Sequence, residues 1–197
     1  MKTMTTMVAA ATLALGATGA ALADPTYGHV GQVNATSYTF EAVATGDVDA
    51  YFLSSEAADT DVLYMSVNGV LTGVTGFDNH TATRNGVALD LGSVNKGDVV
   101  TFYIDNVTTG ITYSSNTAQN IDGTNHVYST NFTAASPIPA STFIAFEDLA
   151  TKVSDHDYND IAFSVTNVAA VPEPANLALM LAGLGLVGAA VRRRRVR

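Results

Sequence analysis

The chain has 197 residues, a length that a single domain could occupy entirely. It carries 18 acidic against 9 basic residues, a formal net charge of −9, which disfavours binding to nucleic acid or anionic lipid and favours cations. It contains no cysteine, which excludes disulfides, a thiol nucleophile and a thiolate metal site.

The first 23 residues have the layout of a secretory signal peptide. Lys2 gives a positive start, the stretch from Met7 to Ala21 is apolar and rich in small residues, and Ala21-Leu22-Ala23 is an A-x-A cleavage site. The alternative is a buried N-terminal helix, but the abundant Ala, Gly and Thr would build a poor core helix. We therefore expect an exported protein whose mature chain begins at Asp24.

Residues 24–170 are predicted to form one all-β domain. No segment of this region has a helical period, and runs rich in Val, Phe, Tyr, Ile and Thr favour strands. The predicted strands are Ser37–Val43, Ala50–Ser54, Val62–Val67, Val70–Val74, Val87–Leu91, Val99–Asp105, His126–Phe132, Thr142–Glu147 and Ile161–Thr166. So many short strands separated by polar turns favour an antiparallel β-sandwich or jelly roll.

Local patterns indicate one hairpin and the strands' core faces. Asn68-Gly69 predicts a two-residue type I′ turn, because both residues tolerate a positive φ. The positions expected to face the core are Val100, Phe102 and Ile104 in one strand and Ile161, Phe163 and Val165 in another. Ala162 and Ser164 are expected on the opposite face.

The predicted domain is more acidic than the whole chain. Five of the nine basic residues lie after position 191, and Lys2 is in the signal segment. Arg84, Lys96 and Lys152 remain against seventeen acidic residues, a net charge of −14. Such a domain should attract cations.

The densest group of polar residues lies between positions 146 and 160. The candidate metal ligands are Glu147, Asp148, Asp155, Asp157, Asn159 and Asp160. Their mutual repulsion would be relieved by Ca²⁺, which takes six to eight oxygen ligands. Asp155, Asp157 and Asn159 have the D-x-D-x-N spacing that begins a calcium loop, although Asp160 and Thr166 replace the Gly and Glu of an EF-hand.

Other interpretations of this segment stay open. It could be a solvated acidic turn in which Asp155 or Asn159 caps backbone amides. Glu147 and Asp148 could be the paired carboxylates of a hydrolase such as a glycosidase, but adjacent strand residues point to opposite faces. No Ser/His/Asp order stands out, so we expect a protein that is not an enzyme.

The C-terminal region reads as a linker followed by a membrane anchor. Residues from Asn167 to Glu173 are expected to form a short linker. An uncharged apolar stretch at 175–191 follows, and a helix of this length, about 25 Å, is at the short end of what spans a bilayer. The cluster Arg192, Arg193, Arg194 and Arg195 then predicts a cytoplasmic C-terminus.

This tail resembles the PEP-CTERM sorting signal of Gram-negative bacteria, also labelled an ice-binding protein C-terminal domain. The resemblance rests on Val171-Pro172-Glu173-Pro174, the apolar stretch and the arginine cluster, in that order. It implies transient anchoring in the inner membrane and recognition by an exosortase-type membrane peptidase near Pro-Glu-Pro. It further implies release or transfer to the outer surface, often in bacteria that make exopolysaccharide.

The domain resembles a family of exported β-domains that have no assigned biochemical activity. The shared motifs are Phe146-Glu147-Asp148-Leu149, Asp155-His156-Asp157-Tyr158-Asn159-Asp160 and, upstream, Asp122-Gly123-Thr124-Asn125-His126. The loop Ala150-Thr151-Lys152-Val153 lacks the family's usual glycine. The resemblance implies calcium binding at the acidic motif.

These features together predict a non-catalytic protein of the cell surface or extracellular matrix, stabilised by calcium and associated with exopolysaccharide. The main alternative is a lectin-like carbohydrate-binding module, for which Tyr103, Tyr113 and Tyr128 are candidates to stack on sugars. A hydrolase is the minor alternative.

Overall fold

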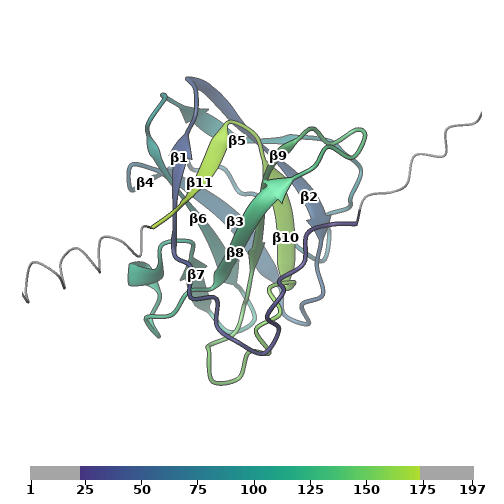
Figure 1. Cartoon of the computed structure of the whole chain (residues 1–197), viewed down its shortest axis with the longest axis vertical. Helices are drawn as coiled ribbons and strands as arrows, with labels where there is room; N and C mark the ends of the chain where they lie inside the picture. The colour runs from purple at the N-terminus through teal and green to yellow at the C-terminus, as the bar shows by residue number, and fades with distance from the viewer. Residues whose placement is uncertain (1–22, 174–197) are drawn as a thin grey trace, which may run out of the picture.

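The computed structural model describes residues 23–173, which fold into two antiparallel sheets. The strands are β1 (Tyr38–Ala42), β2 (Gly46–Ser54), β3 (Asp61–Val67), β4 (Val70–Leu71), β5 (Leu89–Val94), β6 (Val99–Asn106), β7 (Ile111–Ser114), β8 (Val127–Phe132), β9 (Ser141–Phe146), β10 (Ile161–Val165) and β11 (Val168–Pro172), with one 3-10 turn, η1 (Thr117–Gln119). Sheet A has the order β11-β1-β6-β3-β4, and β7 also pairs with β6. Sheet B has the order β5-β2-β10-β9-β8. The prediction of an all-β antiparallel sandwich is confirmed (Figure 1).

Several expected segments lie outside the described residues. They are the signal peptide up to residue 22, Pro174 of the sorting motif, the apolar stretch 175–191 and the arginine cluster at 192–195. Among residues 23–173, the structure has no helix with the length and apolarity needed to span a membrane.

The main core lies between the two sheets and uses the positions that alternation predicts. Phe102 of sheet A and Phe163 of sheet B are fully buried, and their rings meet edge to face with centroids 5.8 Å apart. Val100 and Ile104, and likewise Ile161 and Val165, are buried in the same cluster. Burial of each such side chain contributes about 1.5–3 kcal/mol, so these two strands carry much of the domain's stability.

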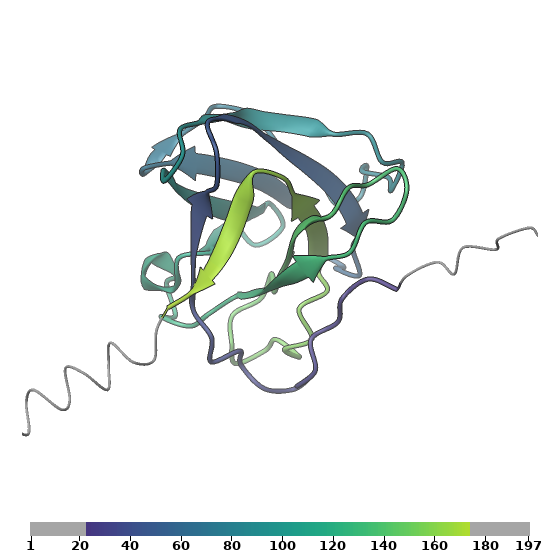
Figure 2. The same ribbon diagram turned by 45° about the horizontal axis from the view of Figure 1, so that its top comes forward.

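A second apolar cluster covers the outer face of sheet B. Ala162, expected to point away from the core, is buried here beside Tyr27 and Tyr158, whose rings lie 4.7 Å apart. The N-terminal segment brings Tyr27 to this face and then passes beside the β9–β10 connection, where the Gly31 N–H donates to the Asp155 carbonyl (Figure 2). Strand β10 is therefore buried on both faces, like a strand between two layers.

The predicted Asn68-Gly69 hairpin is confirmed, but the strand that follows it is shorter than expected, and strand β7 was not predicted. Asn68 and Gly69 have φ values of 49° and 82° and connect β3 to β4, as a type I′ turn requires. The run Val70–Val74 was expected to be one strand, but pairing ends at Leu71. Strand β7 was missed because it is short and gains its order by pairing with the end of β6.

The expectation that residues 167–173 form a linker is wrong. Val168–Pro172 form β11, which pairs antiparallel with the whole of β1. The Thr142 hydroxyl donates to the Val168 carbonyl at 2.6 Å, and the Val168 side chain is buried. An alanine-rich segment with weak strand propensity becomes a strand because β1 offers a free edge.

Candidate metal centre

The acidic segment forms the connection between β9 and β10, residues 147–160, at one end of the sandwich (Figure 1). Its path is fixed by the buried ring of Tyr158, whose hydroxyl donates to the Asn125 carbonyl and accepts the Asn34 N–H. His156 and Tyr158 have positive φ values of 55° and 56°, which turn the chain back toward the end of β9. The Tyr158 N–H and the Ser154 hydroxyl can thereby both donate to the Glu147 carboxylate.

The first carboxylate group consists of Glu147, Asp155 and Asp157. One carboxylate oxygen from each lies within 4.8 Å of the other two. Oxygens on opposite sides of a bound Ca²⁺ are separated by about 5 Å at most, so the spacing suits this ion. Burial, together with the charges of Asp155 and Glu147, raises the pKa of Asp157 to about 6. The group thus gathers negative charge without a basic partner among the described residues.

The second carboxylate group consists of Asp61, Asp148 and Asp160. The Asp148 and Asp160 carboxyl groups are within hydrogen-bonding reach of each other, as are those of Asp61 and Asp148. The Asp148 N–H donates to Asp160 Oδ2 at 2.8 Å. Burial raises the pKa of Asp61 to about 7, with the charges of Asp160, Asp59 and Asp105 acting in the same direction. Burial, together with the neighbouring carboxylates, also raises the pKa values of Asp148 and Asp160.

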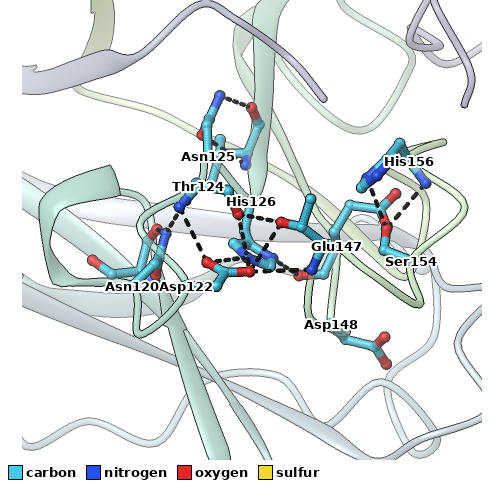
Figure 3. A network of polar contacts seen from close by, with 12 residues as sticks. Asn120, Asp122, Thr124, Asn125, His126, Glu147, Asp148, Ser154 and His156 are labelled. Carbon is cyan, nitrogen blue, oxygen red and sulfur yellow. Dashed lines mark hydrogen bonds and ion pairs between the residues drawn. The ribbon is translucent and has the colours of Figure 1, made fainter. Parts of the chain in front are cut away.

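Five of the six predicted ligands are therefore divided between two groups, Glu147, Asp155 and Asp157 in the first and Asp148 and Asp160 in the second. Glu147 and Asp148 point to opposite sides, as expected for consecutive residues: Figure 3 shows Glu147 extending toward Ser154 and the Asp148 carboxyl pointing away from this network. Asn159 joins neither group, because its N–H and its side-chain amide both donate to Asp157. Sequence reasoning missed Asp61, whose only signal is an acidic residue at the start of a strongly apolar strand.

The upstream motif Asp122–His126 is hydrogen-bonded to Glu147 and to the β9–β10 connection. His126 is buried, and its Nδ1 lies 3.1 Å from the Glu147 carbonyl while its Nε2 lies 3.1 Å from Asp122 (Figure 3). Asp122 also accepts the Thr151 N–H and hydroxyl, which ties the β9–β10 connection to this motif. Tyr113, expected to be exposed for sugar stacking, is instead buried and stacked on His126 with centroids 4.1 Å apart.

A separate hollow of about 400 Å³ lies on the outer face of sheet A. It is lined by Tyr64, Leu71, Tyr103, Asp105 and Thr112. Tyr64 and Tyr103 are directly paired across β3 and β6, so their rings share one face of the sheet. Asp105 accepts a hydrogen bond from the Thr112 hydroxyl at 3.0 Å at the hollow's polar side.

Two family models match the chain. Residues 32–167 match the family described as Domain of unknown function (DUF4114), and residues 170–195 match the PEP-CTERM protein-sorting motif. Neither the curated proteins nor the solved structures contain a match to this chain. The sorting motif confirms the expectation of an exported protein, anchored transiently through its C-terminal tail and processed by an exosortase-type membrane enzyme.

Proposed function

The chain belongs to the DUF4114 family, and we propose that its domain is a non-catalytic module of the cell surface or extracellular matrix whose fold is stabilised by calcium. The observation that carries the proposal is the convergence of Glu147, Asp155 and Asp157 at the end of the sandwich, where carboxylate oxygens lie within 4.8 Å of one another. An exported domain without cysteine has no disulfides to stabilise it, and extracellular modules commonly use calcium bound at about 10⁻⁴–10⁻³ M for this purpose.

The surroundings of these residues favour a structural role over catalysis. Glu147 is 2% exposed, and its two oxygens are already engaged by the Ser154 hydroxyl and the Tyr158 N–H. Asp148 is equally buried, so a polysaccharide substrate would have no access to this carboxylate pair. A cation bound by Glu147 would instead hold Asp155 and Asp157 against the end of β9.

Calcium removal tests this proposal. At free calcium ten times the dissociation constant, binding adds about 1.4 kcal/mol of stability, a rise of about 3–5 °C in the melting midpoint for a domain of this size. The full chain, purified in detergent, should therefore melt at a higher temperature in millimolar calcium than in EDTA. Magnesium should raise the midpoint less, because it prefers a tight octahedron and retains its waters.

Asp157→Asn should remove most of the difference between calcium and EDTA. The matched control is Glu41→Gln, which removes one negative charge from an exposed position on β1 and should keep the full calcium effect. Identical melting curves in calcium and EDTA for the unmodified chain would refute calcium stabilisation.

The hollow on sheet A favours a second candidate function, binding of a neutral polysaccharide. The half-buried tyrosines Tyr64 and Tyr103 offer adjacent ring faces for stacking on sugar rings, and Asp105 and Thr112 offer hydrogen-bonding groups for hydroxyls. The net charge of −14 between residues 24 and 170 disfavours polyanionic glycans. An association with exopolysaccharide through this face would retain the released protein in an extracellular matrix.

A glycan array and affinity electrophoresis in neutral polysaccharide gels test this second function. Tyr64→Ala combined with Tyr103→Ala should weaken retention at least about tenfold, the equivalent of about 1.4 kcal/mol. Tyr51→Ala, which removes a half-buried tyrosine from sheet B, is the matched control and should leave retention unchanged. Retention that survives the double substitution would exclude this face.

A further inference from the structure

We propose that residues 24–33 form an N-terminal strap whose docking on the outer face of sheet B is coupled to cation binding by Glu147, Asp155 and Asp157. This coupling rests on the proposed function, because it takes that group as the calcium site, and it adds a conformational response to binding. The strap lies beside the β9–β10 connection and belongs to no strand (Figure 2). Its attachment therefore depends on individual contacts, and two of these come from the loop that carries the carboxylates.

Tyr27 is the anchor of the strap. Its side chain is 9% exposed and belongs to the second apolar cluster, together with Phe143 and Ala162 of sheet B. Its ring meets the Tyr158 ring edge to face, with centroids 4.7 Å apart, and lies 5.3 Å from the Tyr128 ring. Burial of an aromatic ring favours the docked strap. Since Tyr158 is part of the acidic loop, the anchor rests on that loop as well as on the sheet.

Gly31 attaches the strap to the loop through the backbone. The turn that contains it is closed by the Gln32 N–H, which donates to the His29 carbonyl at 3.0 Å. Gly31 has a φ of 84°, a conformation that favours glycine. Its N–H donates to the carbonyls of Asp155 at 3.0 Å and His156 at 3.3 Å. Asp155 therefore binds the strap with its backbone, while its side chain belongs to the cation site.

Both contacts lie next to carboxylates that a cation would draw together. Tyr158 directly follows Asp157, and its N–H donates to the Glu147 carboxylate. Without a cation, the three carboxylates of the site repel one another. This repulsion favours loop conformations in which Asp155 moves outward and withdraws its carbonyl from Gly31. Calcium binding and strap docking should therefore strengthen each other, and by linkage they must do so to the same extent.

The strap can open without unfolding the sandwich. A cavity of about 410 Å³, whose lining includes Val30 of the strap and Phe143 of β9, leaves the strap incompletely packed. At its N-terminal end, Asp24 pairs with Arg84 in an exposed position, and exposed ion pairs contribute little stability. Just beyond the strap, Asn34 is buried, and its side-chain amide donates to the first carbonyl of β8 at 2.9 Å. The chain is thus fixed at Asn34, and the preceding segment has the few buried contacts that make local opening inexpensive.

Hydrogen exchange of the full chain in detergent, followed by mass spectrometry in millimolar calcium and in EDTA, tests the coupling. Peptides that cover residues 24–33 should exchange at least about fivefold more slowly in calcium, the low end of the range for coupled sites. Asp157→Asn should remove this protection, whereas the control Glu41→Gln should keep it. Peptides from β6 should exchange far more slowly than the strap in both conditions, which identifies exchange of the strap as local opening.

Releasing the strap should in turn weaken calcium binding. Tyr27→Ala removes the anchor and should raise the calcium dissociation constant, measured by calorimetric titration, at least about fivefold. Tyr51→Ala, which removes another half-buried tyrosine from sheet B, is the matched control and should leave the constant unchanged. If circular dichroism shows that Tyr27→Ala does not fold, Gly31→Pro provides the same comparison. Proline removes the N–H that binds the loop and cannot adopt a φ of 84°.

Failure of the coupling and failure of the proposed function give different results. If calcium raises the melting midpoint but leaves exchange of residues 24–33 unchanged, the coupling is wrong and calcium stabilisation stands. An unchanged calcium dissociation constant in both Tyr27→Ala and Gly31→Pro would also overturn the coupling alone. The absence of calcium binding to the unmodified chain would overturn both.

Discussion

Glu147 and Asp148 are consecutive residues that serve two different carboxylate groups. Each is 2% exposed, but the Glu147 carboxylate is held by the Ser154 hydroxyl and the Tyr158 N–H, whereas Asp148 faces Asp61 and Asp160. The alternation of side chains at the end of β9 causes this separation. Two consecutive acidic residues can in this way join carboxylate groups on opposite sides of the chain.

Loss of Asp122 should destabilise the part of the fold that holds Glu147 in position. It accepts hydrogen bonds from the Thr151 N–H at 3.1 Å and from the Thr124 N–H at 3.1 Å, and it pairs with His126. Partial burial acts to raise the pKa of Asp122, but these hydrogen bonds outweigh it and hold the pKa well below its usual range. The ionised form of Asp122 is therefore the stabilising form.

The sign of this pKa change fixes the pH dependence. A carboxylate with a lowered pKa in the folded state adds stability above its unfolded pKa of about 3.9, and loses that contribution as the pH falls toward the folded value. Asp122→Ala should cost about 1–3 kcal/mol at pH 7 in urea unfolding, and the difference should shrink at pH 3. Asp90→Ala, which removes one exposed bond to the Gly92 N–H, is the control. An equal loss at both pH values would show that the charge of Asp122 is not responsible.

At the level of secondary-structure elements, strands with a complete local pattern could be predicted and strands that depend on a distant partner could not. Alternation identified the buried positions of β6 and β10, and Asn68-Gly69 identified the hairpin that joins β3 to β4. The alanine-rich β11 has little strand propensity of its own, and its pairing with β1 spans most of the chain. Burial of Ala162 likewise depends on Tyr27, from the far N-terminal segment.

The candidate metal site was likewise predictable where its residues are close in sequence and not where they come from distant strands. The spacing of acidic residues within 147–160 was enough to locate the loop that gathers them. The contribution of Asp61 was not predictable, because nothing near Val62 or Leu63 distinguishes this residue from an ordinary polar residue at a strand start. Only the pairing of β3 with β6, and the packing of sheet A on sheet B, bring Asp61 to Asp148.

At the scale of the whole molecule, the sorting motif begins inside the folded domain. Val171 and Pro172 are the last residues of β11 and pair with Thr39 and Tyr38 of β1. The Glu173 N–H donates to the Ser37 carbonyl at 2.9 Å, which extends this attachment by one more residue. The processing enzyme therefore meets a motif that is partly hydrogen-bonded into the edge of sheet A.

We predict that detaching the motif from β1 accelerates removal of the tail. A peptidase acting near Pro-Glu-Pro needs an extended chain that is free of the sheet, so the end of β11 must first open. Local opening at a strand end costs little, and an opening free energy of about 0.7–1.4 kcal/mol corresponds to a rate difference of about three- to tenfold.

Inserting a flexible Gly/Ser segment of about eight residues after Ala170 would remove this barrier. Pulse-chase labelling with mass spectrometry, in a host that has the sorting peptidase, measures the rate. The same segment inserted between the exposed residues Thr83 and Arg84 is the control and should leave the rate unchanged. Equal rates for the Ala170 insertion and the unmodified chain would mean that the enzyme reaches the motif while β11 stays paired.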